Sequence, residues 1–280
     1  MIRTSSRYTN NLGSYYQTYN LVLGTSLVLG PWSLVLNIPM FELYTGRSPF
    51  ITGDVFYQDA KRRSPLTNSL IAHWKPNESS GVRADSHGGN DLGDNNTTGS
   101  AAGKLGNAAS FVAGNEESLS IGDNAALSMG DIDFTVAFWV WFDALTATGL
   151  AGKWSTGSFE YLAYFDGTNL RFHVSNNGFA NVSVVNSQSI STATWYFYLA
   201  WHDATANTIN LSVNNNTPAS TAHTTGVHNG NASFYLGRNE EALTYLSGRL
   251  DSLSIWKRLL TANERTQLYN AGSGLDYPFS

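Results

Sequence analysis

The chain of 280 residues lacks cysteine altogether and is poor in charge, because Asp, Glu, Lys and Arg make up only 13% of it, about half the usual share in a soluble domain. The missing thiols exclude thiol catalysis, zinc sites built on cysteine, iron–sulfur clusters and disulfides. The 16 basic residues are outnumbered by 21 acidic ones, so the chain lacks the basic surplus that nucleic-acid binding requires. We therefore expect no nucleic-acid partner.

Aromatic residues and glycine take the place of charge, with 14 Tyr, 14 Phe, 8 Trp and 26 Gly. Aromatic side chains favour the half-buried surface of a pleated sheet, and Gly and Asn supply the positive-φ turns that join short strands. This composition predicts an all-β protein whose solvent face carries Ser, Thr and Asn.

The first 65 residues differ from the rest, because they contain an uncharged apolar run from Leu21 to Phe41. The run is just long enough for a membrane-spanning helix, and Arg3 and Arg7 precede it. Turn-forming residues interrupt the run, however, and no clean cleavage site for a signal peptide follows it. We expect an extended assembly arm that docks on a partner rather than a membrane span; the interrupting residues are Gly24, Gly30, Pro31 and Pro39.

Short alternating segments separated by Gly, Asn, Asp and Ser follow from residue 66 onward. The clearest predicted strands are Phe134–Phe142, Trp195–Trp201 and Thr208–Val213, with a hairpin turn at 166–169. Along Phe134–Phe142 the Phe and Val side chains alternate with two Trp side chains, so both faces of this strand are expected to be covered. Near the end of the chain, Thr261 and Glu264 form a capping-box pattern that predicts one short helix, with Gly272 as its C-cap.

Five segments in order resemble one family. They are Leu70–Leu92, GKLGNAASF (103–111), FTVAFWVWF (134–142), TWYFYLAWHD (194–203) and the ending from Leu236 to Gly272. Together they resemble the laminin-G-like, concanavalin A-like jelly rolls of bacterial and phage surface proteins, over residues 69 to 279. The resemblance implies a two-sheet antiparallel jelly roll at 66–280, and the predicted arm at 1–65 lies outside the resemblance. It does not fix a function, since the same sandwich hosts lectins, spacers, capsid components and glycosidases.

A structural calcium site is expected around Asp251. Strand alternation places this carboxylate on the side of Leu253 and Ile255, hence in the interior, where a charge needs a cation or several donors. Calcium prefers hard oxygen ligands, and the Gly-rich loops after residue 76 offer them in the family pattern. The alternative is that Asp251 binds an arginine (Arg83, Arg249 or Arg258) or backbone N–H groups. The predicted calcium set is Glu78, Asp85, Asn90 and Asp251.

Carbohydrate binding needs aromatic platforms beside polar groups, because sugars present C–H faces to rings and hydroxyls to polar atoms. The alternative for any aromatic residue of a sandwich is that it fills the core. The candidate ligand contacts, chosen by their position in or beside loops, are Trp154, Tyr164, Trp201 and Tyr245.

Catalysis is not expected. Glycoside hydrolysis needs two carboxylates across a site, whereas the acidic pairs at 116–117 and 240–241 are adjacent and would point apart in an extended chain. No nucleophile elbow, phosphate loop or dinucleotide motif occurs, and His223 and His228 lack a third metal ligand.

These observations predict a non-enzymatic structural or adhesion protein of a particle surface, most simply a phage virion. In this hypothesis the arm binds other virion subunits or a second copy, and the jelly roll projects outward and can bind host-surface glycans. A capsid decoration protein, a head fibre and a tail appendage all fit. The alternative is a secreted or cell-surface bacterial carbohydrate-binding module whose apolar run serves export or anchoring.

Overall fold

The computed structural model describes residues 3–9, 15–20 and 65–279. The chain divides into two compact units, Met1–Gln58 and Asp59–Ser280. In the first unit, β1 (Arg3–Thr9) pairs antiparallel with β2 (Tyr15–Asn20). The apolar run 21–41 and most of the predicted arm lie outside the described residues, and the predicted division at residue 65 falls inside the second unit. Within the described ranges, no helix has the length and apolar character needed to cross a membrane.

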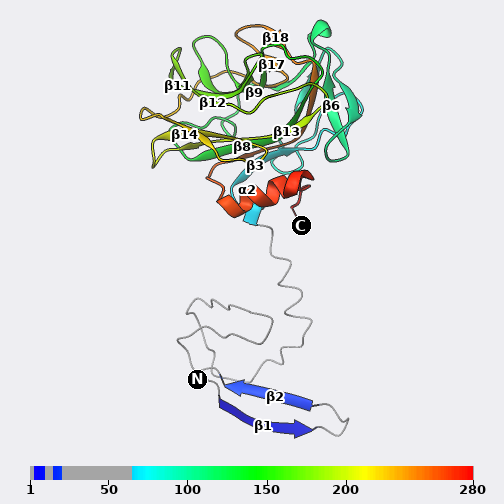
Figure 1. Cartoon of the computed structure of the whole chain (residues 1–280), viewed down its shortest axis with the longest axis vertical. Helices are drawn as coiled ribbons and strands as arrows, with labels where there is room; N and C mark the ends of the chain where they lie inside the picture. The colour runs from blue at the N-terminus through cyan, green and yellow to red at the C-terminus, as the bar shows by residue number, and fades with distance from the viewer. Residues whose placement is uncertain (1–2, 10–14, 21–64, 280) are drawn as a thin grey trace. The chain divides into compact units, whose positions relative to one another are not determined.

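The second unit is a sandwich of two antiparallel sheets, as the sequence predicts, and Figure 1 shows them stacked face to face. One sheet has seven strands. In spatial order they are β12 (Asn181–Asn186), β11 (Leu170–Gly178), β10 (Phe159–Phe165), β9 (Thr148–Lys153), β16 (Phe234–Leu236), β7 (Ser118–Ile121) and β4 (Gly93–Asn95).

The other sheet has eight strands. In spatial order they are β15 (Ala219–Ala222), β14 (Thr208–Val213), β13 (Trp195–Asp203), β8 (Phe134–Phe142), β19 (Gly248–Trp256), β6 (Asn107–Phe111) and β5 (Gly99–Ala102), with β3 (Leu70–Trp74) paired to β19. A small ribbon of β17 (Arg238–Asn239) and β18 (Thr244–Tyr245) lies apart from both sheets. Among the described residues, three single-turn 3-10 helices occupy Pro65–Thr67, Ala113–Asn115 and Asn270–Gly272.

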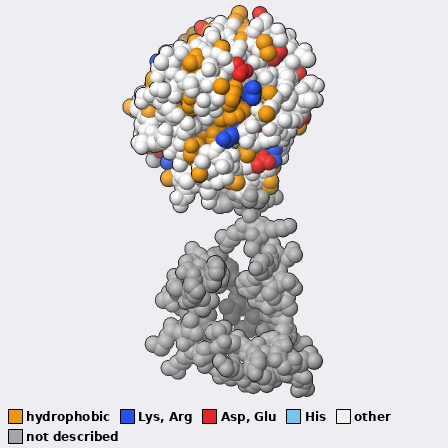
Figure 2. Space-filling model, turned by 45° about the vertical axis from the view of Figure 1, so that its right-hand side comes forward, with side chains coloured by type: hydrophobic (Ala, Val, Ile, Leu, Met, Phe, Trp, Pro, Cys, Tyr) orange, Lys and Arg blue, Asp and Glu red, His pale blue; other side chains and the backbone are white. Residues whose placement is uncertain are grey.

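The core lies between the sheets and follows the alternation of β8. Phe134, Phe138 and Phe142 belong to the buried cluster between the sheets, whereas Trp139 belongs to a second cluster on the opposite face of the eight-stranded sheet. This confirms the two-faced strand predicted at 134–142. Outside the core, Figure 2 shows a face made mostly of uncharged side chains and backbone, with few charged groups, as the composition leads one to expect.

Helix α2 (Ala262–Tyr269) covers part of the outer face of the eight-stranded sheet (Figure 1). Thr261 and Glu264 form the predicted capping box at its start. At its end the left-handed C-cap is Asn270 and not Gly272, because the chain turns two residues earlier and continues as a 3-10 turn.

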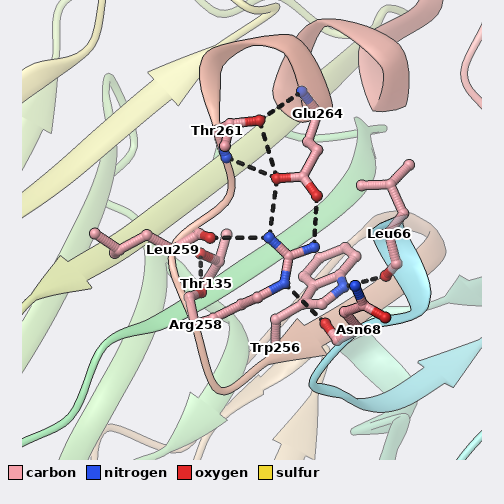
Figure 3. Close-up of polar contacts among 8 residues, drawn as sticks. All are labelled: Leu66, Asn68, Thr135, Trp256, Arg258, Leu259, Thr261 and Glu264. Carbon is pink, nitrogen blue, oxygen red and sulfur yellow. Dashed lines mark hydrogen bonds and ion pairs between the residues drawn. The ribbon is translucent and has the colours of Figure 1, made fainter. Parts of the chain in front are cut away.

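Arg258 ties this helix to the start of the jelly roll (Figure 3). Its guanidinium donates to both carboxylate oxygens of Glu264 at 2.7 and 2.9 Å and to the carbonyl of Asn68 at 2.8 Å. Beside it, Trp256 Nε1 donates to the carbonyl of Leu66 at 2.6 Å. The hydrogen bonds from Arg258 lower the pKa of Glu264 to about 2, so this ion pair persists well below neutral pH.

Candidate functional site

A pocket of about 490 Å³ opens where three strand-connecting loops meet. The loops join β7 to β8, β9 to β10 and β15 to β16. The volume lies in the range of small-molecule sites, and the lining offers carboxylate, amide, hydroxyl and imidazole groups. The lining residues are Asp123, Ala125, Ser128, Ser158, His228, Asn229, Gly230 and Asn231.

An exposed aromatic ring stands beside these loops. Phe179, at the tip of the β11–β12 hairpin, is 66% exposed. A Cβ placed on Gly157, next to the pocket residue Ser158, would lie 3.5 Å from Cζ of Phe179, so the ring lies against the β9–β10 loop. Exposing a phenyl ring to water is unfavourable, and a ring held at the edge of a polar pocket is the arrangement that suits a sugar.

Glycine makes the close approach of these loops possible. Gly178 has φ +84°, and a Cβ there would come within 2.6 Å of the carbonyl oxygen of Gly157 and 3.2 Å of the His228 ring. The hairpin tip therefore packs directly on the other loops. Two hydrogen bonds fix the arrangement, from His228 N to the Ser175 carbonyl and from Ser158 Oγ to Asn231 Oδ1, each 2.6 Å long.

A buried ammonium group supports the pocket wall from behind. The Lys153 side chain is fully buried, and its Nζ lies 2.6 Å from Asp123 Oδ1 and 2.8 Å from Glu160 Oε1, and donates to Ser128 Oγ. Glu160 is also fully buried, whereas the side chain of Asp123 is 45% exposed and faces the pocket. Lys153 therefore holds both an acid and a hydroxyl of the lining in place.

The electrostatics of this group follow from burial. Burial raises the pKa of the Glu160 carboxyl to about 7, while the hydrogen bond and charge of Lys153 act in the opposite direction. An unpaired carboxylate or ammonium in this interior would be strongly unfavourable, so the pair is a fixed structural element behind the pocket.

The predicted aromatic contacts are spread over the molecule. Trp154 is 5% exposed and stacks on Phe159 with ring centroids 4.3 Å apart, and the half-buried Tyr164 packs against this cluster. Trp201 is buried beneath Arg265 of α2, and the half-buried Tyr245 contacts the guanidinium of Arg238. The structure brings together only Trp154 and Tyr164.

Two of the predicted calcium ligands, Asp85 and Asn90, bind each other through Asp85 Oδ2 and Asn90 Nδ2 at 2.8 Å. Asp85 also accepts backbone N–H bonds from His73, His87 and Asn90. Burial alone would raise the pKa of Asp85, but these bonds outweigh it and lower the pKa. Glu78 accepts from the backbone N–H of Ala84.

Asp251 lies elsewhere, and the orientation predicted for it is wrong. Ser252 has φ +50° and interrupts the pairing of β19 with β8, so Asp251 pairs with Trp139 on the outer face of the sheet while Leu253 faces the core. The carboxylate is nevertheless 1% exposed, and its Oδ2 accepts the backbone N–H groups of Lys104 and Leu105 at 2.7 and 2.8 Å. Burial raises its pKa to about 6.

These positions do not bring the four predicted ligands into one shell. Within residues 65–279 and the described part of the N-terminal unit, no group of three or more His, Asp or Glu side chains is placed to hold a metal ion. Asp85 and Asp251 instead accept hydrogen bonds from N–H groups. For Asp251, backbone N–H groups are one of the alternatives to calcium given above. Calcium binding stays a prediction without a shared site.

The pocket itself was missed by the sequence reasoning. Its residues come from three loops whose meeting depends on the fold, and single loop residues such as Asn229 carry no signal. Phe179 does carry one, because it directly follows Asn176–Asn177–Gly178. A large apolar residue at the tip of a turn of this type is expected to be exposed.

The sequence also matches a family model described as the concanavalin A-like lectin/glucanases superfamily, over residues 113–264. The chain belongs to this superfamily. The matched range contains all the pocket residues and Phe179. No curated protein matches the chain.

Solved structures with the same fold are distant in sequence. The binding domain of Paraclostridial mosquitocidal protein 1 has a TM-score of 0.62 at 16% identity, over 74% of this chain and 53% of that one. The binding domain of botulinum neurotoxin DC in complex with SialylT has a TM-score of 0.56 at 11% identity, over 74% of this chain and 52% of that one. A structure of botulinum neurotoxin type C, a toxin whose cell entry depends on two ganglioside molecules, has a TM-score of 0.56 at 12% identity, over the same shares of the two chains. This chain spans about half the length of these structures, and at such identities the likeness establishes the fold.

Proposed function

We propose that this chain is a non-enzymatic adhesion protein whose jelly roll binds a glycan at the loop pocket beside Phe179. The observation that carries the proposal is an exposed ring at the edge of a pocket lined by hydrogen-bonding groups. A sugar ring can pack a C–H face on Phe179 while its hydroxyls bind the polar lining. Membership of the concanavalin A-like lectin/glucanases superfamily and the glycan ligands named for two similar toxin structures support the same ligand class.

The polar groups suit neutral hydroxyls. Ser158 Oγ donates to Asn231 Oδ1, which leaves the amide N–H groups of Asn231 as donors toward a ligand. Asp123, held by Lys153, has a second carboxylate oxygen that can accept from a hydroxyl. A sugar hydroxyl that enters the pocket loses its hydrogen bonds to water, and a buried polar group left without a partner costs about 1–3 kcal/mol. Sugar recognition therefore requires donors and acceptors in fixed positions.

Binding without hydrolysis fits the acids near the pocket. A glycosidase needs one carboxyl as acid and another as base or nucleophile, both able to reach the substrate. Here Asp123 is ion-paired, and Glu160 is fully buried behind Lys153. Neither geometry supports proton transfer to a sugar oxygen.

We further propose that residues 1–65 attach the chain to a particle, such as a phage virion, and that the jelly roll is presented at the surface. The support is the uncharged run Leu21–Phe41 in a chain that otherwise surrounds an apolar core with polar residues. An apolar segment of this length needs a partner to cover it. The alternative of a secreted or cell-surface module predicts the same jelly roll with a different use of the run.

A glycan array probed with the full chain tests the binding function. The Phe179→Ala variant is expected to lose the signals from neutral glycans, whereas Leu243→Ala keeps them, since Leu243 is 62% exposed but lies beside β18 and away from the pocket. Neutral-glycan signals that survive Phe179→Ala unchanged would contradict the proposed site. Sugar release from a polysaccharide panel by the unmodified chain would contradict the non-enzymatic assignment.

The attachment is tested by comparing the full chain with residues 59–280, the second compact unit. We expect the shorter chain to be a soluble monomer and the full chain to assemble with itself or with particle subunits, as measured by light scattering. A full chain that is a stable monomer, together with an insoluble residue 59–280 fragment, would show that the arm does not serve attachment.

A further inference from the structure

A row of aromatic and cationic side chains crosses the outer face of the eight-stranded sheet, on the side of the sheet away from the core. Trp195 on β13 pairs with Trp141 on β8, and Trp141 pairs with Arg249 on β19. Their neighbours along β8, Val140 and Phe142, face the core, so this row faces outward. The two indole centroids are 5.7 Å apart.

Helix α2 leaves this row partly open. The helix and the residues after it bury Trp139, Phe197 and Trp201, with Tyr269 stacked 5.9 Å from Trp139. Trp141 lies two residues from Trp139 on β8, and Trp195 lies two residues from Phe197 on β13; both stay partly exposed. The two indole rings are tilted by 56° to each other, so each partly exposed ring can pack against a separate sugar ring of a chain that follows the sheet.

Two cations accompany the row. The guanidinium of Arg249 lies 4.9 Å from the centroid of the Trp141 ring, and Nζ of Lys104 lies 4.7 Å from that of Trp139. Trp139 and Trp141 are alternate residues of one strand, so the two residues that the cations contact are on the order of 7 Å apart along it. None of the ion pairs among the described residues includes either of them.

Both cations are held in place. The turn that carries Lys104 is fixed by the buried carboxylate of Asp251, which accepts its backbone N–H. Arg249 Nη1 donates to the carbonyl of Ala102 at 3.2 Å, which leaves its other terminal nitrogen to bind a ligand. Two acids lie nearby: Asp143 accepts from Trp141 Nε1 at 2.8 Å, and Asp251 accepts the backbone N–H groups of Lys104 and Leu105.

We propose that this surface, Trp195–Trp141–Arg249 with Lys104, is a second binding site, and that its ligand is an anionic polysaccharide carrying carboxylate or sulfate groups. The tryptophans receive sugar rings, and the cations receive the acidic groups. Arginine binds carboxylate and sulfate through two parallel hydrogen bonds. In a chain of net charge −5, two cations that form no ion pair with an acid can bind the anionic groups of such a ligand. The site is separate from the pocket at Phe179 and does not depend on it.

The test measures binding of the full chain to polygalacturonate, polysialic acid and chondroitin sulfate by isothermal titration calorimetry. Fully methyl-esterified polygalacturonate is the matched neutral probe. We expect at least one acidic polymer to bind, and Arg249→Gln to weaken it about tenfold, the loss of one charge-assisted contact. Lys104→Gln is expected to weaken it less, and added salt to weaken it further.

Control variants separate this site from other effects. Arg238→Gln removes a guanidinium that lies over Tyr235 in the same way, at 4.7 Å, and is expected to change nothing. Phe179→Ala should leave acidic-polymer binding intact, and Arg249→Gln should leave binding at the pocket intact. The proposal is overturned if no acidic polymer binds, if the methyl ester binds as tightly as the acid, if Arg249→Gln has no effect, or if single-stranded DNA binds equally well.

Discussion

Replacing Asp251 by Asn should remove a defined part of the pH dependence of folding. In the folded chain this carboxylate is 1% exposed, and burial raises its pKa to about 6, against about 3.9 in an unfolded chain. The folded state therefore binds the proton more tightly. For such a group the contribution to stability is fully present below about pH 4 and is lost as pH rises to about 6.

The size of this effect follows from the difference in pKa. About two pKa units at about 1.4 kcal/mol each give a loss of roughly 3 kcal/mol in the free energy of unfolding between pH 4 and pH 6. Asn has nearly the same shape and does not titrate, so its oxygen can still accept the N–H groups of Lys104 and Leu105. The difference between the wild-type and Asp251→Asn curves isolates this residue from the other titrating groups.

Urea unfolding followed by tryptophan fluorescence, at half-unit steps from pH 4 to pH 8, measures both curves. We expect the wild type to lose stability relative to Asp251→Asn across this window and the gap to be constant above about pH 7. Parallel curves at every pH would refute the reasoning, because Asp251 would then titrate as it does in the unfolded chain.

Three further predictions concern the remaining charged groups. Lys153→Met should lower the free energy of unfolding by roughly 3–5 kcal/mol, because it leaves Glu160 buried without its cation. The control Lys75→Met breaks a pair with the exposed Asp276 and should lower it by about 1 kcal/mol or less. Equal losses in urea unfolding would be inconsistent with this reasoning. Glu264→Gln should destabilise the chain at pH 7 but not at pH 2. The pKa of Glu264 is lowered to about 2, so the carboxylate's contribution to stability is lost as pH falls through about 2. EDTA tests the predicted calcium: bound structural Ca²⁺ predicts a lower unfolding midpoint in EDTA that added Ca²⁺ restores, and a midpoint unchanged within about 1 °C would contradict the prediction.

The strands could be predicted where local pattern and tertiary structure agree. Phe134–Phe142 alternates strictly, and its ends match the observed strand, because both of its faces are buried and no residue in it breaks the pleat. The turn at 166–169 and the capping box at Thr261 depend only on neighbouring residues, so the sequence contains all of their determinants.

Asp251 illustrates what strand alternation misses. The pattern of alternate residues fails at Ser252, whose positive φ inserts one extra residue into β19. No residue type at this position announces a bulge, since Ser is common in regular strands as well. A one-residue shift moves a side chain to the other face, which is why the burial of Asp251 was foreseen and its direction was not.

The sequence could predict the type of the candidate site but not the residues that form it. The sequence indicated a sugar-binding jelly roll with aromatic contacts, but the aromatic residues chosen near loops include the buried Trp154 and Trp201. The pocket depends on contacts between loops more than 70 residues apart, such as Ser158 with Asn231. Contacts of this kind arise from the register of the sheets and are not encoded in any local segment.

The position of a bound sugar tests the central claim most directly. A crystal structure of the full chain with the strongest neutral ligand from the glycan array should place one sugar ring against Phe179, with hydroxyls hydrogen-bonded to Asp123 and Asn231. A neutral sugar bound elsewhere, with the pocket beside Phe179 holding only solvent, would contradict the proposed function.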